Sequence, residues 1–177
     1  MKRNEYATLI AITVLTFASC GEEKKKQAAG TDSPTEMEAK KEKIAKASFS
    51  DEMTGKVFRN YLQLKIALTN SDVQEAQMAA AHLSEVFAEE LDTLKTITGQ
   101  LAKTDDLERQ RELFSDFTAK VEPLFRDNIS SGILYKKFCP MAFNGDGGYW
   151  FSDDDRIRNP YYGEKMLKCG QVTETIQ

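Results

Sequence analysis

Apolar residues recur every three or four positions from residue 53 to residue 124, which is the spacing of one face of an α-helix. One run covers residues 53–68, a second covers residues 76–94, and a third covers residues 107–124. We expect Pro123 to kink the third helix or to end it early. This periodicity predicts three amphipathic helices.

Polar residues that can cap helices separate the three runs. Asp72 followed by Glu75 resembles a capping box at the start of the second helix, which we expect to end at Gly99. Asp105 with Glu108 begins the third helix. Helices joined by short links pack antiparallel. The expected fold class is therefore mainly α, a small antiparallel bundle of three or four helices with an irregular C-terminal cap.

That cap, residues 132–170, differs from the rest in composition and is called the cap segment below. It holds six of the ten glycines, four of the six tyrosines, the only tryptophan and two of the three cysteines. Within it we expect a short strand at residues 133–138, a tight turn at 144–148 and a short helix at 163–169. Turn formers and aromatic residues at this density predict a compact, irregular structure in which function is concentrated.

The N-terminal region has the layout of a bacterial lipoprotein signal. Lys2 and Arg3 precede an apolar run at residues 7–17, and small residues lead directly to Cys20. We expect residues 1–19 to be a signal peptide and Cys20 to carry the lipid, which places the protein in the cell envelope, on the outer membrane at its periplasmic or surface side. The charged residues 20–48 read as a flexible linker, and residues 49–177 as a single helical domain.

Charge and composition exclude several functions. The net charge is -4 and no basic stripe is present, which argues against a nucleic-acid partner. The single histidine, His82, lies on a helix flank near Met78, and we interpret it as a surface residue and not as a metal ligand. Asp153, Asp154 and Asp155 do not follow the pattern of a calcium loop. No catalytic motif is found, so we expect no enzyme.

Four sulfur-bearing side chains in the cap segment form the candidate site. Cys139 and Met141 open the segment, and Met166 and Cys169 close it. Two thiols and two thioethers without a hard ligand favour Cu(I). The same two cysteines in an oxidising envelope can instead form a disulfide, which would stabilise the fold by about 3 to 4 kcal/mol. Spacing does not separate these alternatives.

The cap segment also resembles a known family. Its Cys-Pro-Met, its glycine-rich turn before Trp-x-Ser, its Asn-Pro-Tyr and its Met-x-x-Cys-Gly are the family's recognisable features, here at residues 139–141, 147–152, 159–161 and 166–170. The family is a DUF3347-like group of bacterial envelope lipoproteins of unknown function. It also occurs as a domain appended to Cus-type copper and heavy-metal efflux adaptors. The resemblance implies a role near copper or heavy-metal handling.

The expected function follows from the sulfur pattern and this resemblance together. Cys139, Met141, Met166 and Cys169 would bind or deliver Cu(I) or another heavy metal, with Tyr149, Trp150 and Tyr161 shielding the site from water. The expected partners are the membrane, through the lipid anchor, and a heavy-metal efflux adaptor. The alternative is a non-catalytic structural or interaction lipoprotein with a Cys139–Cys169 disulfide and no metal.

Overall fold

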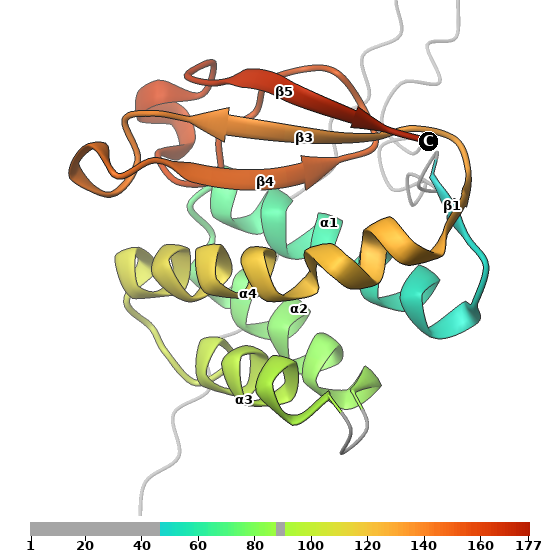
Figure 1. The fold of residues 1–177 in the computed structure, drawn as a ribbon. Coiled ribbons are helices and arrows are strands. Elements are labelled where there is room, and N and C mark those ends of the chain that lie inside the picture. The colour runs from blue at the N-terminus through green and yellow to red at the C-terminus, as the bar shows by residue number, and fades with distance from the viewer. Residues whose placement is uncertain (1–46, 88–90) are drawn as a thin grey trace, which may run out of the picture. The chain divides into compact units, whose positions relative to one another are not determined.

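The computed structural model describes residues 47–87 and 91–177, which belong to one unit spanning Glu42–Gln177 (Figure 1). The predicted signal peptide, Cys20 and nearly all of the predicted linker lie outside the described residues. In chain order the described elements are β1 (Ser48–Phe49), α1 (Glu52–Thr69), α2 (Val73–Val86), α3 (Asp92–Leu101), α4 (Leu107–Asn128), β2 (Ile129–Ser131), β3 (Leu134–Cys139), β4 (Gly148–Ser152) and β5 (Gln171–Ile176). No helix in the described part is both long and apolar enough to cross a membrane.

Aspartate side chains begin three of the helices. The Asp72 carboxylate accepts a hydrogen bond from the Glu75 main-chain N–H at 3.0 Å, which confirms the predicted start of α2. At the start of α1, the Asp51 carboxylate accepts a hydrogen bond from the Thr54 main-chain N–H at 2.7 Å. At α4 the capping residue is Asp106 and not the predicted Asp105. Each carboxylate satisfies a donor that the first helical turn leaves unpaired.

Two predicted helix ends were wrong, because the second helix stops before Gly99 and the third does not end at Pro123. The single helix predicted from residue 72 to Gly99 is interrupted, because α2 ends at Val86 and Phe87 has extended backbone. Phe87 is 2% exposed and packs on the Phe117 ring, so it continues the apolar stripe although the helix has ended. The helix α4 continues through Pro123 to Asn128. Buried residues on either side of the proline pack into the core, and this packing keeps α4 helical there.

The aromatic core forms where α1 and α4 meet the sheet. Tyr61 of α1 is fully buried. The centroid of its ring lies within 5.5 Å of the centroids of the Phe114 and Phe125 rings of α4. Its hydroxyl shares a hydrogen bond with Thr118 and accepts another from the Phe151 main-chain N–H. Burying each such ring contributes about 2 to 3 kcal/mol. One polar group therefore joins α1, α4 and β4 inside the core.

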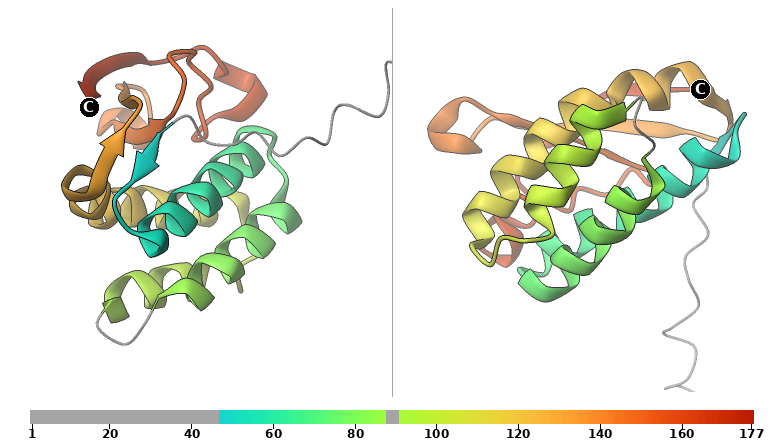
Figure 2. Two further views of the ribbon diagram at one scale, coloured as in Figure 1. Left: turned by 90° about the vertical axis from the view of Figure 1, so that its right-hand side faces the viewer. Right: turned by 90° about the horizontal axis from the view of Figure 1, so that it is seen from below.

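The prediction of a mainly α bundle with an irregular cap was wrong, because the fold is mixed α and β. Residues 134–176 contain a three-stranded antiparallel sheet in the order β4-β3-β5, and β1 pairs with β2 in a second ladder. Figures 1 and 2 show the three-stranded sheet on one side of α1 and α4 and the helices α2 and α3 on the other. The predicted strand at residues 133–138 is confirmed as β3, whereas β4 and β5 were not expected.

A glycine-rich turn joins β3 to β4, and two ion pairs connect the sheet to α4. Gly147 has a φ of +84°, and a Cβ there would lie 2.4 Å from the Phe138 ring, so the turn between β3 and β4 requires glycine. Lys136 of β3 binds Glu122 of α4 at 2.8 Å. Arg126, also on α4, binds Glu174 of β5 at 2.8 Å. The helix thus fixes both strands.

The connection from β4 to β5 is held to the helices by a buried arginine. Arg111 of α4 is 3% exposed, and its Nε donates to the Pro160 carbonyl at 3.1 Å. Its Nη2 donates to the Leu68 carbonyl and the Ser71 hydroxyl. The helix predicted at residues 163–169 is a shorter 3-10 turn, Gly163–Met166. This arrangement fixes the segment that leads to Cys169.

Candidate thiol site

The sheet brings Cys139 and Cys169 together. Cys139 is the last residue of β3, and Cys169 lies two residues before β5 begins. Because Phe138 of β3 pairs with Gln171 of β5, the two cysteines reach the same end of the sheet. Their Sγ atoms are 3.0 Å apart, although thirty positions separate them in sequence.

Both cysteines are free thiols, and their surroundings differ. Cys139 is fully buried, whereas Cys169 is partly exposed. The hydrogen bond with the Cys139 thiol, together with burial, raises the pKa of Cys169, and the Met141 main-chain N–H acts in the opposite direction. The pair is therefore asymmetric, with one sulfur inside the fold and one at its surface.

The separation of the sulfurs lies between two familiar geometries. A disulfide bond measures about 2.05 Å. Two thiolates bound to one tetrahedral zinc, with zinc–sulfur bonds of about 2.3 Å, would lie about 3.8 Å apart. At 3.0 Å, the pair reaches either state by side-chain movements of about 1 Å or less.

The two predicted methionine ligands are close neighbours of the cysteines in the chain. The Cys169 N–H donates to the Met166 carbonyl at 2.9 Å, so these residues close one turn. The Tyr162 hydroxyl donates to the Met141 carbonyl at 2.6 Å. Met141 is 52% exposed and Met166 is partly buried. Both thioethers therefore belong to residues within one turn of the thiols.

The three predicted shielding residues occupy different environments. Trp150 is fully buried, and a Cβ on Gly170 would lie 2.7 Å from its ring, so the indole covers the residue next to Cys169. The buried Tyr161 ring lies against Gly148, the β4 partner of Cys139, and its hydroxyl donates to the Tyr149 carbonyl. Burial raises the pKa of Tyr161. Tyr149 itself is 45% exposed.

Within residues 47–87 and 91–177 no three or more His, Cys, Asp or Glu side chains come together in a way that could hold a metal ion. The donors that the structure brings together here are thus the two cysteines, and the neighbouring methionines are further sulfur ligands by prediction only. A donor set of this kind suits a soft monovalent ion.

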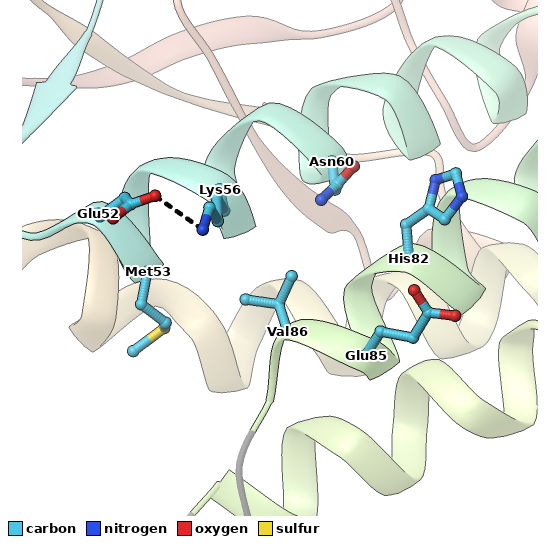
Figure 3. Close-up of a pocket in the computed structure, with 7 residues that line it drawn as sticks. All are labelled: Glu52, Met53, Lys56, Asn60, His82, Glu85 and Val86. Carbon is cyan, nitrogen blue, oxygen red and sulfur yellow. Dashed lines mark ion pairs between the residues drawn. The ribbon is translucent and has the colours of Figure 1, made fainter.

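His82 lies in a different part of the fold. A groove of about 710 Å³ opens between α1 and α2, and it is lined by Glu52, Met53, Lys56, Asn60, His82, Glu85 and Val86. Figure 3 shows His82 and Glu85 on α2, with Asn60 across the groove and the Glu52–Lys56 ion pair further along α1. This is the first half of α1, whereas Gly163 of the cap segment contacts its other end at Thr69. The groove and the thiols are separate features.

Sequence reasoning missed a buried charged cluster formed by β3, α1 and the residues that follow β4. Lys137 of β3 is fully buried, and its Nζ donates to the Arg156 carbonyl at 2.6 Å and lies 3.6 Å from an Asp154 carboxylate oxygen. Lys65 of α1 is 5% exposed and donates to the Ser152 hydroxyl at 3.4 Å. Burial, and then the charge of Lys65, lower the pKa of Lys137 to about 8. The available signal was the aspartate run at residues 153–155.

Residues 57–132 match the model of a family described as a protein of unknown function, DUF3347. The match covers most of α1, all of α2 to α4 and the strand β2, and it supports a DUF3347-like family. The motifs of the cap segment that carry the resemblance, from residue 139 onward, lie outside the matched residues. No curated protein and no solved structure matches the chain.

Proposed function

We propose that this DUF3347-like protein is a non-catalytic lipoprotein of the bacterial envelope that binds Cu(I) or another thiophilic metal ion. Cys139 and Cys169 would be the thiolate ligands, and Met141 and Met166 would supply thioether sulfurs. Cys20 would anchor the chain to the outer membrane. The observation that carries the proposal is the 3.0 Å approach of two free thiols, one of them partly exposed.

The chemistry of the donors supports a soft ion. Thiolates and thioethers select Cu(I) over magnesium, calcium or manganese. Each thiol must lose its proton to bind, so one metal ion replaces two protons at the pair. Because Cys139 is fully buried, the charge of its thiolate has to be compensated, and a bound cation does so directly. A role in metal homeostasis or efflux, beside a heavy-metal efflux adaptor, would use such a carrier.

A structural or interaction lipoprotein with a Cys139–Cys169 disulfide is the second candidate. The observation that favours it is the same separation, which is about 1 Å longer than a disulfide bond. Oxidising compartments form such bonds readily. In this case no metal would bind, and the cap segment would present a fixed surface to another envelope protein.

Titration of reduced protein with Cu(I) separates the two candidates. The chain carries Cys20→Ala so that Cys139 and Cys169 are its remaining cysteines, and a chromogenic Cu(I) chelator competes for the metal under anaerobic conditions. We expect one Cu(I) per chain, loss of binding in Cys169→Ala, and weaker binding in the Met141→Leu/Met166→Leu double variant. His82→Ala is the matched control and should bind copper like the parent.

Absence of Cu(I) uptake by the fully reduced parent at competitor strength would end the metal proposal. Unchanged affinity in the double methionine variant would remove the thioethers from the site while leaving the thiols. A thiol count on protein purified without reductant gives the second candidate its own test, since a structural disulfide leaves no free thiol there.

A further inference from the structure

We infer that the thiol pair is redox-active and that its two cysteines react in a fixed order. Cys169 exchanges with an external disulfide, and Cys139 then attacks the resulting mixed disulfide from inside the fold. The two roles follow from burial and distance at the pair, independently of any metal. The regulatory consequence drawn below rests on the proposed metal binding.

Access to solvent distinguishes the two sulfurs. Cys139 is fully buried at the end of the central strand, where it pairs with Gly148 beneath the Tyr161 ring. Cys169 is partly exposed on the connection to β5. An external disulfide has to approach the attacking sulfur along the S–S axis, which requires open space around it. Only Cys169 of the pair has such an approach.

The surroundings of Cys169 hold its main chain while leaving the sulfur accessible. Its N–H donates to the Met166 carbonyl, and its carbonyl accepts from the Asn159 side chain at 2.9 Å. Met141, the neighbour on the other side, is 52% exposed and offers a flexible apolar surface. A modified Cys169 side chain can therefore point outward without loss of these main-chain contacts.

Proximity makes the second step intramolecular. The two Sγ atoms lie 3.0 Å apart, at the lower end of the range of about 3 to 3.5 Å that is typical of reacting atoms held for attack. Cys139 is the last residue of β3 and its backbone is held by the ladder to β4. The buried thiol is thus positioned to displace whatever group becomes attached to Cys169.

The chemistry balances with a disulfide, RSSR, as the oxidant. The Cys169 thiolate attacks one sulfur of RSSR, forms a new S–S bond and releases RS⁻. The Cys139 thiolate then attacks the Cys169 sulfur, forms the Cys139–Cys169 bond and releases the second RS⁻. The two protons given up by the cysteines convert these anions to two RSH, so two electrons pass from the pair to the oxidant.

Oxidation would switch the proposed metal site off. A disulfide has no thiolate to offer, so a Cu(I) ion bound by the pair would be released when the S–S bond forms. A dithiol reverses the exchange and restores the site. The state of the pair would thus report the redox balance of the compartment.

The test is a reaction with glutathione disulfide on reduced, folded chain carrying Cys20→Ala. In the parent we expect an intramolecular disulfide and two released glutathione molecules. In Cys139→Ala a stable glutathione adduct should accumulate on Cys169. In Cys169→Ala the buried Cys139 should react at least about tenfold more slowly, because it has to wait for local opening. In urea both variants should react at the same rate.

Equal rates for the two folded variants would overturn the assignment of roles. A second measurement needs no variant that could misfold. A brief pulse of iodoacetamide on the reduced parent, followed by peptide mapping, should label Cys169 first, and preferential labelling of Cys139 would contradict the inference. Cu(I) titration is a separate readout, so failed copper binding with the expected exchange would refute the proposed function alone.

Discussion

The buried lysine of β3 makes the stability of this fold rise with pH above neutrality. Lys137 is fully buried, and burial followed by the charge of Lys65 lowers its pKa from 10.5 to about 8, with Asp154 acting in the opposite sense. We predict that Lys137→Met removes this dependence. The methionine side chain can occupy the same space without an ionisable group.

The sign and size follow from proton linkage. Below pH 8 both states carry the proton, and the folded state bears the full cost of the buried ammonium group. Between pH 8 and 10.5 the folded chain has released the proton that the unfolded chain still binds, so stability rises with pH. The full shift corresponds to about 3.4 kcal/mol, of which about 2 kcal/mol would be gained between pH 7 and 9.5.

The assay is urea unfolding of the parent and of Lys137→Met at several pH values between about 7 and 9.5. The fluorescence of Trp150 monitors the unfolding transition. The difference in unfolding free energy isolates Lys137, because the thiols and tyrosines are common to both proteins. The unfolding free energy of the parent minus that of Lys137→Met should increase by about 2 kcal/mol as pH rises over this range. Lys136→Met, which alters the neighbouring strand residue, should keep the parent's slope. Parallel curves for the parent and Lys137→Met would refute the reasoning.

Two further predictions concern positions where the backbone or a charge is buried. Gly170→Ala should destabilise the fold by about 2 kcal/mol or more and alter the emission of Trp150, because the new Cβ would lie 2.7 Å from the indole at a φ of +135°. Gly145→Ala has open space and a φ of +104°, so it should show the smaller backbone cost alone, and equal losses would contradict the clash. Arg111→Met should cost about 3 kcal/mol by chemical denaturation, since it leaves the Pro160 carbonyl without its donor. Arg109→Met, on the exposed face, should stay within about 0.5 kcal/mol, and a similar loss in both would argue against the buried contacts.

Local signals were readable from the sequence, and signals that depend on distant partners were not. The start of α2 was predictable because a capping aspartate acts on a residue three positions away. The end of α2 was not, since Phe87 keeps the helical apolar spacing while its backbone is extended. The strand β5 carries no buried residue and is defined by its pairing with β3, so its β-branched residues Val172, Thr173, Thr175 and Ile176 were the only local signal for a strand.

The candidate site was likewise predictable only in part from the sequence. The pattern Cys-x-Met and Met-x-x-Cys named the sulfur residues, and the structure brings the two thiols to 3.0 Å. Sequence alone could not assign one cysteine to the interior and the other to the surface, because that difference comes from Tyr161 and β4 covering Cys139. Lys137 was missed because a lysine in a strand is ordinarily solvent-exposed.

The strand order β4-β3-β5 also has a kinetic consequence. The helices and the β3–β4 hairpin join neighbouring stretches of chain, and contacts of that kind form quickly. Adding β5 to the open edge of β3 requires closure of the long connection that follows β4, which costs more chain entropy before it gains contacts. We therefore expect β5 to join the sheet last and the two cysteines to come together at that step. The approach of the two thiols would then mark the completion of folding. An oxidant that acts earlier would encounter two separate, reactive sulfurs.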